Sequence, residues 1–219
     1  MTVIDKKTFT ISGLQKSTTD TDGSLIYYFC SSDPNAPLAG VPGMGQFTSE
    51  PVGLIQNNAI VPSAVSQTQD YKVTYTYKDV VSGCEQDTTF TVYVSAINKE
   101  VDWTIAPALD RPWGDGPYEF CQPSVSNPKQ GVPLQGYPQL AAGRWDLIGS
   151  ESIGGGTAPS GAIVTPTTGV PEATSNLKGI VAGNIYNIRY SVVDEFGCMG
   201  SKTKKIKHHA RRQRPLPFM

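Results

Sequence analysis

The chain of 219 residues carries little charge and almost no histidine. Charged side chains make up 17% of the sequence, and the two histidines, His208 and His209, are adjacent. This scarcity leaves no histidine for a Ser-His-Asp arrangement or a metal site in the rest of the chain. The sequence also contains no run of about 18 apolar residues, so we expect no transmembrane helix. Its first residues lack the apolar segment of a signal peptide, so we expect no such leader.

Turn-forming residues are abundant by comparison. The chain has 22 glycines and 17 prolines, while hydrophobic residues make up 38%. Glycine and proline together stay below the share of roughly 25–30% that is typical of low-complexity sequence. Long stretches of Ala, Glu, Lys and Leu are missing, which argues against a helical bundle. The length allows one large domain or two small ones.

The basic side chains are unevenly placed. Seven of the 18 Lys and Arg residues lie in the last 18 positions, and all 19 acidic residues precede them. The acidic body should repel nucleic acid and anionic membranes, so we expect neither as a partner. The basic stretch is interpreted as a solvated linker or chain end, with anion binding as the alternative.

The four cysteines are Cys30, Cys84, Cys121 and Cys198. None of them forms a C-x-x-C pair, which excludes zinc-ribbon and thioredoxin-like patterns. An even number of widely spaced cysteines is typical of disulfides in an oxidising compartment. Four buried free thiols are the alternative.

Five landmarks occur twice in the same order, which indicates a tandem repeat. In each copy a Phe-Cys pair comes first, then a Leu-x-Gly-x-Pro motif, a Gly-x-aromatic motif, a tyrosine-rich stretch ending in Asp, and a Gly-Cys pair. The first copy has these at Phe29-Cys30, Leu38–Pro42, Gly45–Phe47, Tyr71–Asp79 and Gly83-Cys84. The second has them at Phe120-Cys121, Leu134–Pro138, Gly143–Trp145, Tyr186–Asp194 and Gly197-Cys198. The second copy is longer, and its surplus falls around residues 149–175.

The landmarks lie on predicted strands. Tyr71–Lys78 and Tyr186–Val192 alternate apolar and polar residues, the pattern of half-buried strands. Further strands are expected at Thr8–Ile11, Thr88–Val94, Val101–Ile105 and Thr203–Lys207. The sequence therefore predicts an all-β chain of two tandem immunoglobulin-like β-sandwich modules. We place these at residues 1–97 and 98–207, the second with an expanded loop at about 149–175, followed by a basic tail at 208–219.

The repeat suggests one disulfide in each module. One cysteine lies near an early strand and the other follows the tyrosine-rich strand, so we predict Cys30–Cys84 and Cys121–Cys198. Each bridge would close a long loop and stabilise its module by about 4 kcal/mol in the chain-entropy treatment. The short connection Ser95–Glu100 predicts that neighbouring modules touch and form a stiff rod.

This combination of motifs resembles the immunoglobulin-like repeats of giant gliding-motility surface adhesins, which are cargo of the type IX secretion system. The resemblance covers most of residues 9–207. It implies an extracellular, cell-surface location, neighbouring modules of the same kind and a role in attachment. The segment Arg211–Met219 does not resemble this family.

Catalysis is not expected. The candidate acids are scattered singly and are Asp79, Glu85, Asp146, Asp194 and Glu195. Since Asp79 and Asp194 hold equivalent places, we expect both to order a turn before the cysteine. The segment Asp20–Gly23 has part of a calcium-loop pattern and is interpreted as a plain turn. An alternative calcium site would use Asp5, Asp33, Glu100 and Asp102. We predict no cofactor and no bound metal.

A ligand site, if the chain has one, is expected in the aromatic loop Asp110–Tyr118 and the insertion Gly149–Ser175. Arg111, Trp113 and Tyr118 belong to this loop, and Trp145 could join them, because Trp, Tyr and Arg often dominate binding surfaces. The alternative is that Trp113 packs its loop onto the sandwich. The leading interpretation is a monomeric, non-catalytic adhesin stalk. The second is a head module that binds a surface glycan or a protein.

Overall fold

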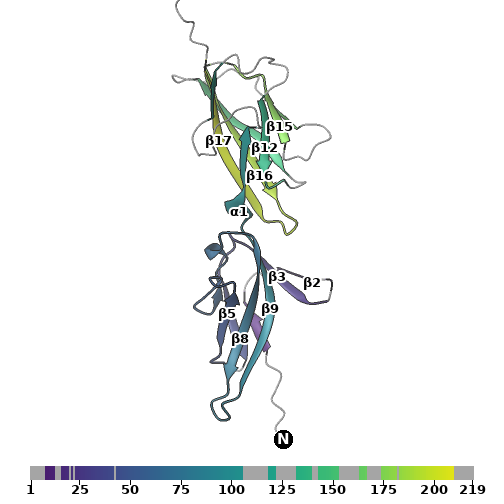
Figure 1. The fold of residues 1–219 in the computed structure, drawn as a ribbon, viewed down its shortest axis with the longest axis vertical. Helices are drawn as coiled ribbons and strands as arrows, with labels where there is room; N and C mark the ends of the chain where they lie inside the picture. Colours follow the sequence, from purple (N-terminus) through teal and green to yellow (C-terminus); the bar gives the residue numbers. More distant parts are fainter. Residues whose placement is uncertain are drawn as a thin grey trace, which may run out of the picture. The chain divides into compact units, whose positions relative to one another are not determined.

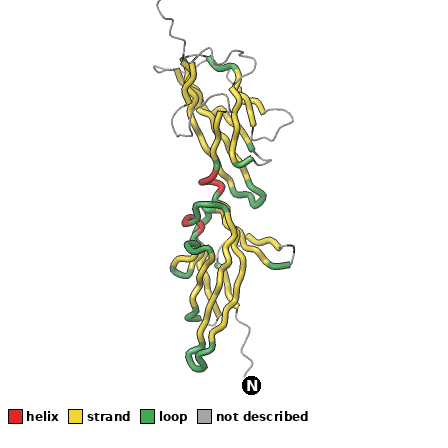
Figure 2. The backbone as a smooth tube through the Cα atoms, in the orientation of Figure 1, coloured by secondary structure: helices red, strands yellow, loops and turns green. Residues whose placement is uncertain are grey.

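A computed structural model describes residues 8–12, 16–19, 21, 23–41, 43–105, 118–121, 132–139, 143–152, 163–166, 174–181 and 183–209. These residues form a mostly β structure with four sheets and a short helix, α1 (Ile97–Glu100) (Figures 1 and 2). The chain divides into two compact units, Met1–Lys99 and Glu100–Met219. Within the described ranges, no helix reaches the length and hydropathy needed to span a membrane.

The first unit contains two sheets. One has the order β1-β4-β7-β6, and the other has the order β2-β3-β9-β8-β5. Their strands are β1 (Thr8–Ile11), β2 (Lys16–Thr19), β3 (Leu25–Cys30), β4 (Ala36–Val41), β5 (Gln46–Glu50), β6 (Ile55–Gln56), β7 (Ala59–Ile60), β8 (Gln69–Lys78) and β9 (Glu85–Ser95). A 3-10 turn, η1 (Pro62–Ala64), precedes β8. All pairings are antiparallel except β3 with β9, which is parallel.

The second unit repeats this arrangement. Its sheets have the orders β10-β12-β15-β14 and β11-β17-β16-β13. The strands are β10 (Asp102–Ile105), β11 (Tyr118–Cys121), β12 (Val132–Tyr137), β13 (Arg144–Ser152), β14 (Ile163–Pro166), β15 (Thr174–Lys178), β16 (Asn184–Val193) and β17 (Met199–His209). Here too a single pairing, β11 with β17, is parallel. Apart from the edge strand β2, which has no counterpart among the described strands of the second unit, the two units therefore share strand order and strand direction.

Alternating burial explains why the tyrosine-rich segments form strands. In β8, Tyr71, Val73 and Tyr75 are buried, and the intervening side chains are more exposed. In β16, Tyr186 and Ile188 follow the same pattern. Aromatic and β-branched residues with this period fit a sheet that has one buried face. The predicted strands at 71–78 and 186–192 are confirmed, as are those at 8–11, 88–94, 101–105 and 203–207, each within a few residues.

One core holds the two sheets of the first unit together. Ile11, Leu38 and Ile60 come from the first sheet and are at most 7% exposed. Val73 and Val92 come from the second sheet and are fully buried in the same cluster. Burying such side chains contributes roughly 1.5–3 kcal/mol each. The apolar contact between the sheets thus holds the two sheets of this unit together.

Two predicted boundaries differ from the structure. The surplus at residues 149–175 is not all loop, because β13 continues to Ser152 and β14 pairs with β15 inside it. The predicted tail at 208–219 begins inside a strand, because β17 runs to His209. His208 is only 2% exposed, so it is a core residue and not part of a solvated tail. Residues 210–219 lie outside the described part.

The predicted disulfide pairing is wrong. Cys30 and Cys198 are disulfide-bonded, whereas Cys84 is an exposed free cysteine. Cys30 lies beside Ser95 at the end of β9, and Cys84 precedes the first residue of that strand. Eleven residues of strand separate these ends by about 35 Å, far beyond the roughly 7 Å between Cα atoms that a disulfide allows.

The same geometry excludes the second predicted pair. Cys121 lies beside His209 at the end of β17, and Cys198 precedes the start of this strand. The two cysteines of each unit do lie at matching positions of the repeat. The predicted pairing is wrong because it assumes that both cysteines of a unit lie at the same end of that unit.

The state of Cys84 gives a direct prediction. When the native, unreduced protein is treated with iodoacetamide, Cys84 should be alkylated, because its thiol is exposed. Cys30 and Cys198 should remain unmodified until a reductant is added. Peptide mass spectrometry measures this. Recovery of an unmodified Cys84 in a peptide linked to Cys30 would restore the original pairing.

Candidate functional site

A tyrosine that fits against a glycine occupies the core of each unit. A Cβ on Gly40 would lie 2.1 Å from the Cζ atom of Tyr75. A Cβ on Gly136 would lie 2.4 Å from the same atom of Tyr190. Real Cβ atoms do not approach so closely, so each Leu-x-Gly-x-Pro motif needs its glycine to admit the ring. The partner of each glycine comes from the opposite sheet of the unit.

The aromatic residue of the Gly-x-aromatic motif packs on the same tyrosine. The ring centroids of Phe47 and Tyr75 are 4.7 Å apart, and those of Trp145 and Tyr190 are also 4.7 Å apart. Tyr190 donates a hydrogen bond from its hydroxyl to the carbonyl oxygen of Pro138 at 2.8 Å. These landmarks therefore form a structural core and not a binding surface.

The two recurring aspartates order turns, as predicted. Asp79 accepts hydrogen bonds from the backbone N–H groups of Val81 and Ser82, at 3.0 and 2.7 Å. Asp194 accepts them from Phe196 and Cys198, at 3.0 and 2.8 Å. Side-chain caps of this kind fix tight turns between paired strands. Both carboxylates are used structurally.

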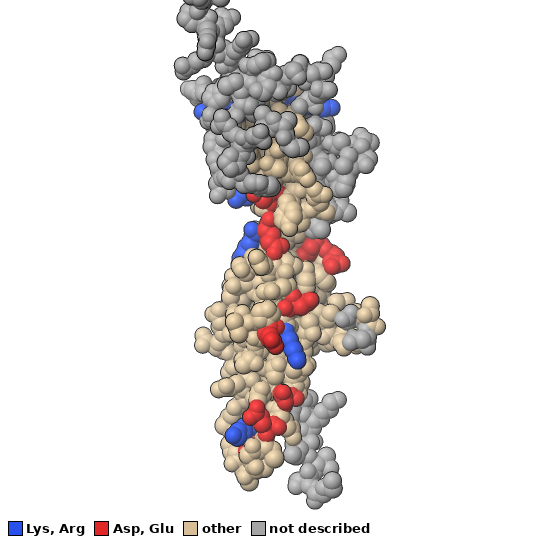
Figure 3. Space-filling model, viewed as in Figure 1, with Lys and Arg blue, Asp and Glu red and all other residues tan. Residues whose placement is uncertain are grey.

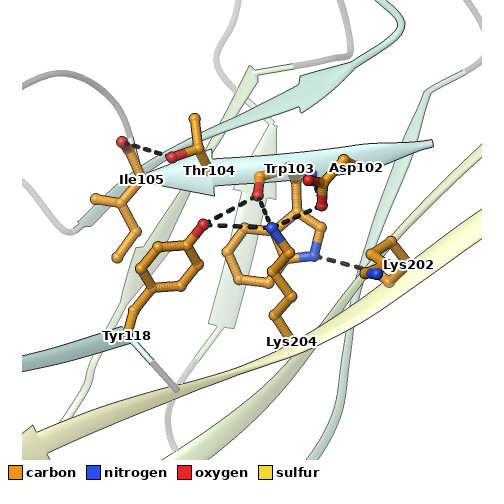
Figure 4. Close-up of polar contacts among 7 residues, drawn as sticks. All are labelled: Asp102, Trp103, Thr104, Ile105, Tyr118, Lys202 and Lys204. Atoms are coloured by element: carbon orange, nitrogen blue, oxygen red, sulfur yellow. Dashed lines mark hydrogen bonds and ion pairs between the residues drawn. The ribbon is translucent and has the colours of Figure 1, made fainter. Parts of the chain in front are cut away.

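A buried lysine is the most unusual feature of the second unit. We use the name Lys204 cluster for Asp102, Trp103, Tyr118 and Lys204 (Figure 4). The Lys204 side chain is 2% exposed and forms an ion pair with Asp102 at 2.6 Å. Its Nζ atom also donates to the carbonyl oxygen of Trp103 at 2.7 Å and to the Tyr118 hydroxyl at 3.3 Å. All three protons of the ammonium group can therefore be satisfied.

Two aromatic rings enclose this ammonium group. The Nζ atom of Lys204 is 5.6 Å from the ring centroid of Trp103 and 5.4 Å from that of Tyr118. The indole of Trp103 in turn donates to the carbonyl oxygen of Lys202 at 3.0 Å (Figure 4). The carboxylate, the carbonyl oxygen and the two ring faces together surround the ammonium group of Lys204.

The first unit holds a phenylalanine at the matching place. Phe90 lies opposite Val73 on β8, just as Lys204 lies opposite Ile188 on β16. The rings of Phe9 and Phe90 stack at 4.1 Å, and Tyr27 meets Phe90 at 5.7 Å. The Lys204 cluster thus replaces an aromatic trio by a cation between two rings. Asp102 takes the register position that Thr8 has in the first unit.

The structure describes two of the four predicted ligand residues and gives them different places. Trp145 is 9% exposed and packs against Trp103 and Tyr190, which places its ring in the core of the unit. Tyr118 is half-buried in the Lys204 cluster, with its hydroxyl committed to the carbonyl oxygen of Trp103 and to Lys204. Arg111 and Trp113 lie outside the described residues. Of the four predicted contacts, the structure therefore describes only Trp145 and Tyr118, and it places both within the packing of the second unit.

The alternative calcium ligands also have other roles. Asp102 pairs with Lys204, and Asp33 accepts the backbone N–H of Cys30 at 2.8 Å. Asp5, Asp20 and Asp22 are outside the described part of the chain. Among the residues that the structure does describe, no group of three or more His, Cys, Asp or Glu side chains could hold a metal ion. On the first unit, the face in view carries acidic side chains at several points along a mostly uncharged surface (Figure 3).

Asp146 lies between two arginines on the second unit. Its carboxylate pairs with Arg144 and Arg189, each at 3.0 Å. Burial raises the pKa of Asp146, but the hydrogen bonds and charges of Arg189 and Arg144 outweigh it and hold the pKa below 3.8. A carboxylate held in its ionised form by two guanidinium groups cannot act as a general acid near neutral pH.

This pairing predicts a small dependence of stability on pH. Because the folded pKa of Asp146 is lowered, its contribution is present above its ordinary value of 3.8 and lost as the pH falls below it. At pH 7 we expect Asp146→Asn to lower the free energy of unfolding by about 0.5 kcal/mol, since both arginines are exposed and screened. Urea titrations at pH 7 and about pH 2.5 measure this. An equal difference at both values would contradict it.

The sequence contains an indication that Lys204 is buried, although a lysine is not normally expected in a core. Phe90 and Lys204 each follow the Gly-Cys cysteine of their unit by the same number of residues. Aligning the copies from that cysteine would have placed the lysine on the buried face. A lysine in a basic stretch is normally interpreted as solvated, so the sequence predicts a solvated side chain for Lys204.

The fold and this site define a protein of two similar all-β units with a closed, ion-paired core cluster in the second. No protein-family model matches the chain, and no curated protein matches it either.

Proposed function

We propose that the chain is a pair of immunoglobulin-like β-sandwich repeats from an extracellular surface adhesin, in which both units serve as non-catalytic spacer modules. The observation that carries this proposal is the repeated strand order. In each unit one sheet reads as strands A-B-E-D, and β9-β8-β5 or β17-β16-β13 reads as G-F-C. This is the order of the immunoglobulin fold.

Two further features support a spacer over a binding head. The aromatic residues Trp145 and Tyr118 are used inside the second unit. The disulfide-bonded cysteines Cys30 and Cys198 suit an oxidising compartment. The resemblance to gliding-motility adhesins adds the expectation that neighbouring modules of the same kind act together in surface attachment.

Surface labelling tests the location. Antibodies against the recombinant chain should label intact cells of the source organism as strongly as permeabilised cells. An antibody against a cytoplasmic protein provides the control for intact membranes. Labelling that requires permeabilisation would overturn the proposal.

Binding assays test the spacer role. The chain, immobilised at high density, should show no binding to a glycan array or to the attachment surface beyond a chain with scrambled sequence. Specific, saturable binding to one glycan or protein would overturn the spacer role and favour the head module instead.

A further inference from the structure

The ion pair of the Lys204 cluster joins distant parts of the second unit. Asp102 lies on β10, the first strand that the structure describes in this unit, and Lys204 lies on β17, the last one. The strands β10 and β17 belong to different sheets. A covalent bond between the two side chains would therefore link both sheets and close a loop that contains nearly the whole unit.

The nitrogen and the carboxyl group of this pair are held in contact. The Nζ atom of Lys204 is 2.6 Å from the Oδ1 atom of Asp102, which places the nitrogen beside the carboxyl carbon (Figure 4). The same oxygen accepts the backbone N–H of Trp103 at 2.8 Å. A donor at this oxygen stabilises the negative charge that develops there when an amine attacks the carbon. Two groups fixed in this way react far more readily than the same groups free in solution.

The surroundings of the pair favour a neutral product. The Lys204 side chain is buried, and the rings of Trp103 and Tyr118 flank its Nζ atom. Two charges in such a place cost desolvation free energy that a neutral amide does not. Asp102 is partly exposed, so a water molecule released at its carboxyl group can reach the solvent. Condensation would thus remove both charges from the core.

We propose that Asp102 and Lys204 condense to an intramolecular isopeptide bond, which makes this pair a self-modification site of the second unit. The bond goes beyond the proposed spacer role, which does not require it. The first unit provides an internal contrast. Thr8 and Phe90 hold the matching places there, and neither residue can form an amide through its side chain.

The reaction is a condensation that releases one water molecule. A proton passes from the ammonium group to the carboxylate, which leaves a neutral amine and a carboxylic acid. The lone pair of Nζ then attacks Cγ of Asp102, and the electrons of the C=O bond move to Oδ1. When the C=O bond forms again, the bond from Cγ to Oδ2 breaks, and its electron pair leaves with the hydroxyl group. The nitrogen gives one proton to that hydroxyl, and the Tyr118 hydroxyl, 3.3 Å from Nζ, can relay it. No oxidant or other reactant is consumed.

Intact-mass and peptide mass spectrometry of the fully reduced protein test the bond. Reduction opens the disulfides, so a remaining mass difference has another cause. We expect the protein to be lighter than its sequence by one water molecule, and a tryptic digest to contain a branched peptide that joins Asp102 to Lys204. Asp102→Asn should lose one ammonia molecule instead, because its side-chain nitrogen is then the leaving group. Asp102→Ala should have the full mass of its sequence.

A competing reaction also releases water and needs its own control. The carboxyl group of Asp102 could close on the backbone nitrogen of Trp103 to give a succinimide. Lys204→Met separates the two reactions, because it keeps the carboxyl group and removes the amine, so this variant should have its full mass. Loss of water that persists in Lys204→Met would overturn the inference, as would a full-mass wild-type protein after prolonged incubation in the folded state. If Lys204→Met does not fold, the wild-type digest decides, since a succinimide gives no branched peptide.

The rate of the reaction tests the proton relay. In protein refolded from inclusion bodies, water should be lost several-fold more slowly in Tyr118→Phe than in the wild type, and both should end at the same mass. An equal rate in the two proteins would overturn the relay through Tyr118.

The two forms of the protein can be told apart by mass. Full-mass protein holds Asp102 and Lys204 as an ion pair, so the contribution of that ion pair to stability is measured in this form. Surface labelling does not depend on the bond. A condensed protein that fails to label the cell surface would therefore refute the adhesin role alone, and a labelled protein of full mass would refute the isopeptide bond alone.

Discussion

Asp102→Ala should destabilise the second unit by about 3 kcal/mol, because it leaves the buried ammonium group of Lys204 without its carboxylate. Lys204 is 2% exposed, so water cannot replace that partner without opening the core. All three tryptophans lie in the second unit, and tryptophan fluorescence therefore reports its unfolding separately. In a thermal melt followed this way, the midpoint should fall by about 10 °C or more.

The opposite substitution should be milder. Lys204→Met removes the buried charge and leaves Asp102, which is 35% exposed and can be solvated. We expect a loss of about 1–2 kcal/mol, less than for Asp102→Ala. The double change Asp102→Thr with Lys204→Phe copies the residues of the first unit and should recover most of the stability. Equal losses for the two single substitutions, or no recovery in the double one, would contradict a desolvated ion pair.

Gly136→Ala should destabilise the second unit by about 2–3 kcal/mol, because its Cβ would lie 2.4 Å from the ring of Tyr190. The ring is fully buried, and its hydroxyl is held by the carbonyl oxygen of Pro138, so it has little room to move. Tryptophan fluorescence during urea unfolding again provides the measurement, helped by the contact of Trp145 with Tyr190.

Gly149→Ala in the same unit is the matched control. Its nearest neighbour would be the side-chain amide of Asn187 at 3.5 Å, an ordinary contact. We expect this variant to change the free energy of unfolding by less than about 0.5 kcal/mol. A similar loss in both variants would mean that glycine flexibility, and not the space for the tyrosine ring, sets the effect.

The strands could be predicted because their information is local. Alternating side chains in residues 71–78 and 186–192 determine which face is buried, whatever the neighbours are. The turn role of Asp79 and Asp194 could be predicted for the same reason, since a carboxylate and the N–H groups it caps are close in sequence. Local sequence patterns were therefore enough to predict these strands and turns.

The disulfides and the Lys204 cluster depend on information that is not local. Whether Cys30 and Cys84 can meet depends on which ends of β9 they reach, and strand direction is not written in cysteine spacing. Lys204 becomes a core residue only because Asp102 and Tyr118 come from two other strands to surround it. The charge of Lys204 predicts a position on the surface, but its contacts with Asp102 and Tyr118 stabilise it in the core.

The fit between tyrosine and glycine has a consequence for how each sandwich is aligned. A slip of one residue in β12 would turn its apolar face outward, and hydrophobic patterning forbids that. A slip of two residues keeps the same face inward, so patterning does not oppose it. Such a slip would bring Leu134 or Pro138 under the ring of Tyr190 in place of Gly136, where no side chain fits. The absence of one side chain therefore selects a single alignment from those that burial alone would accept.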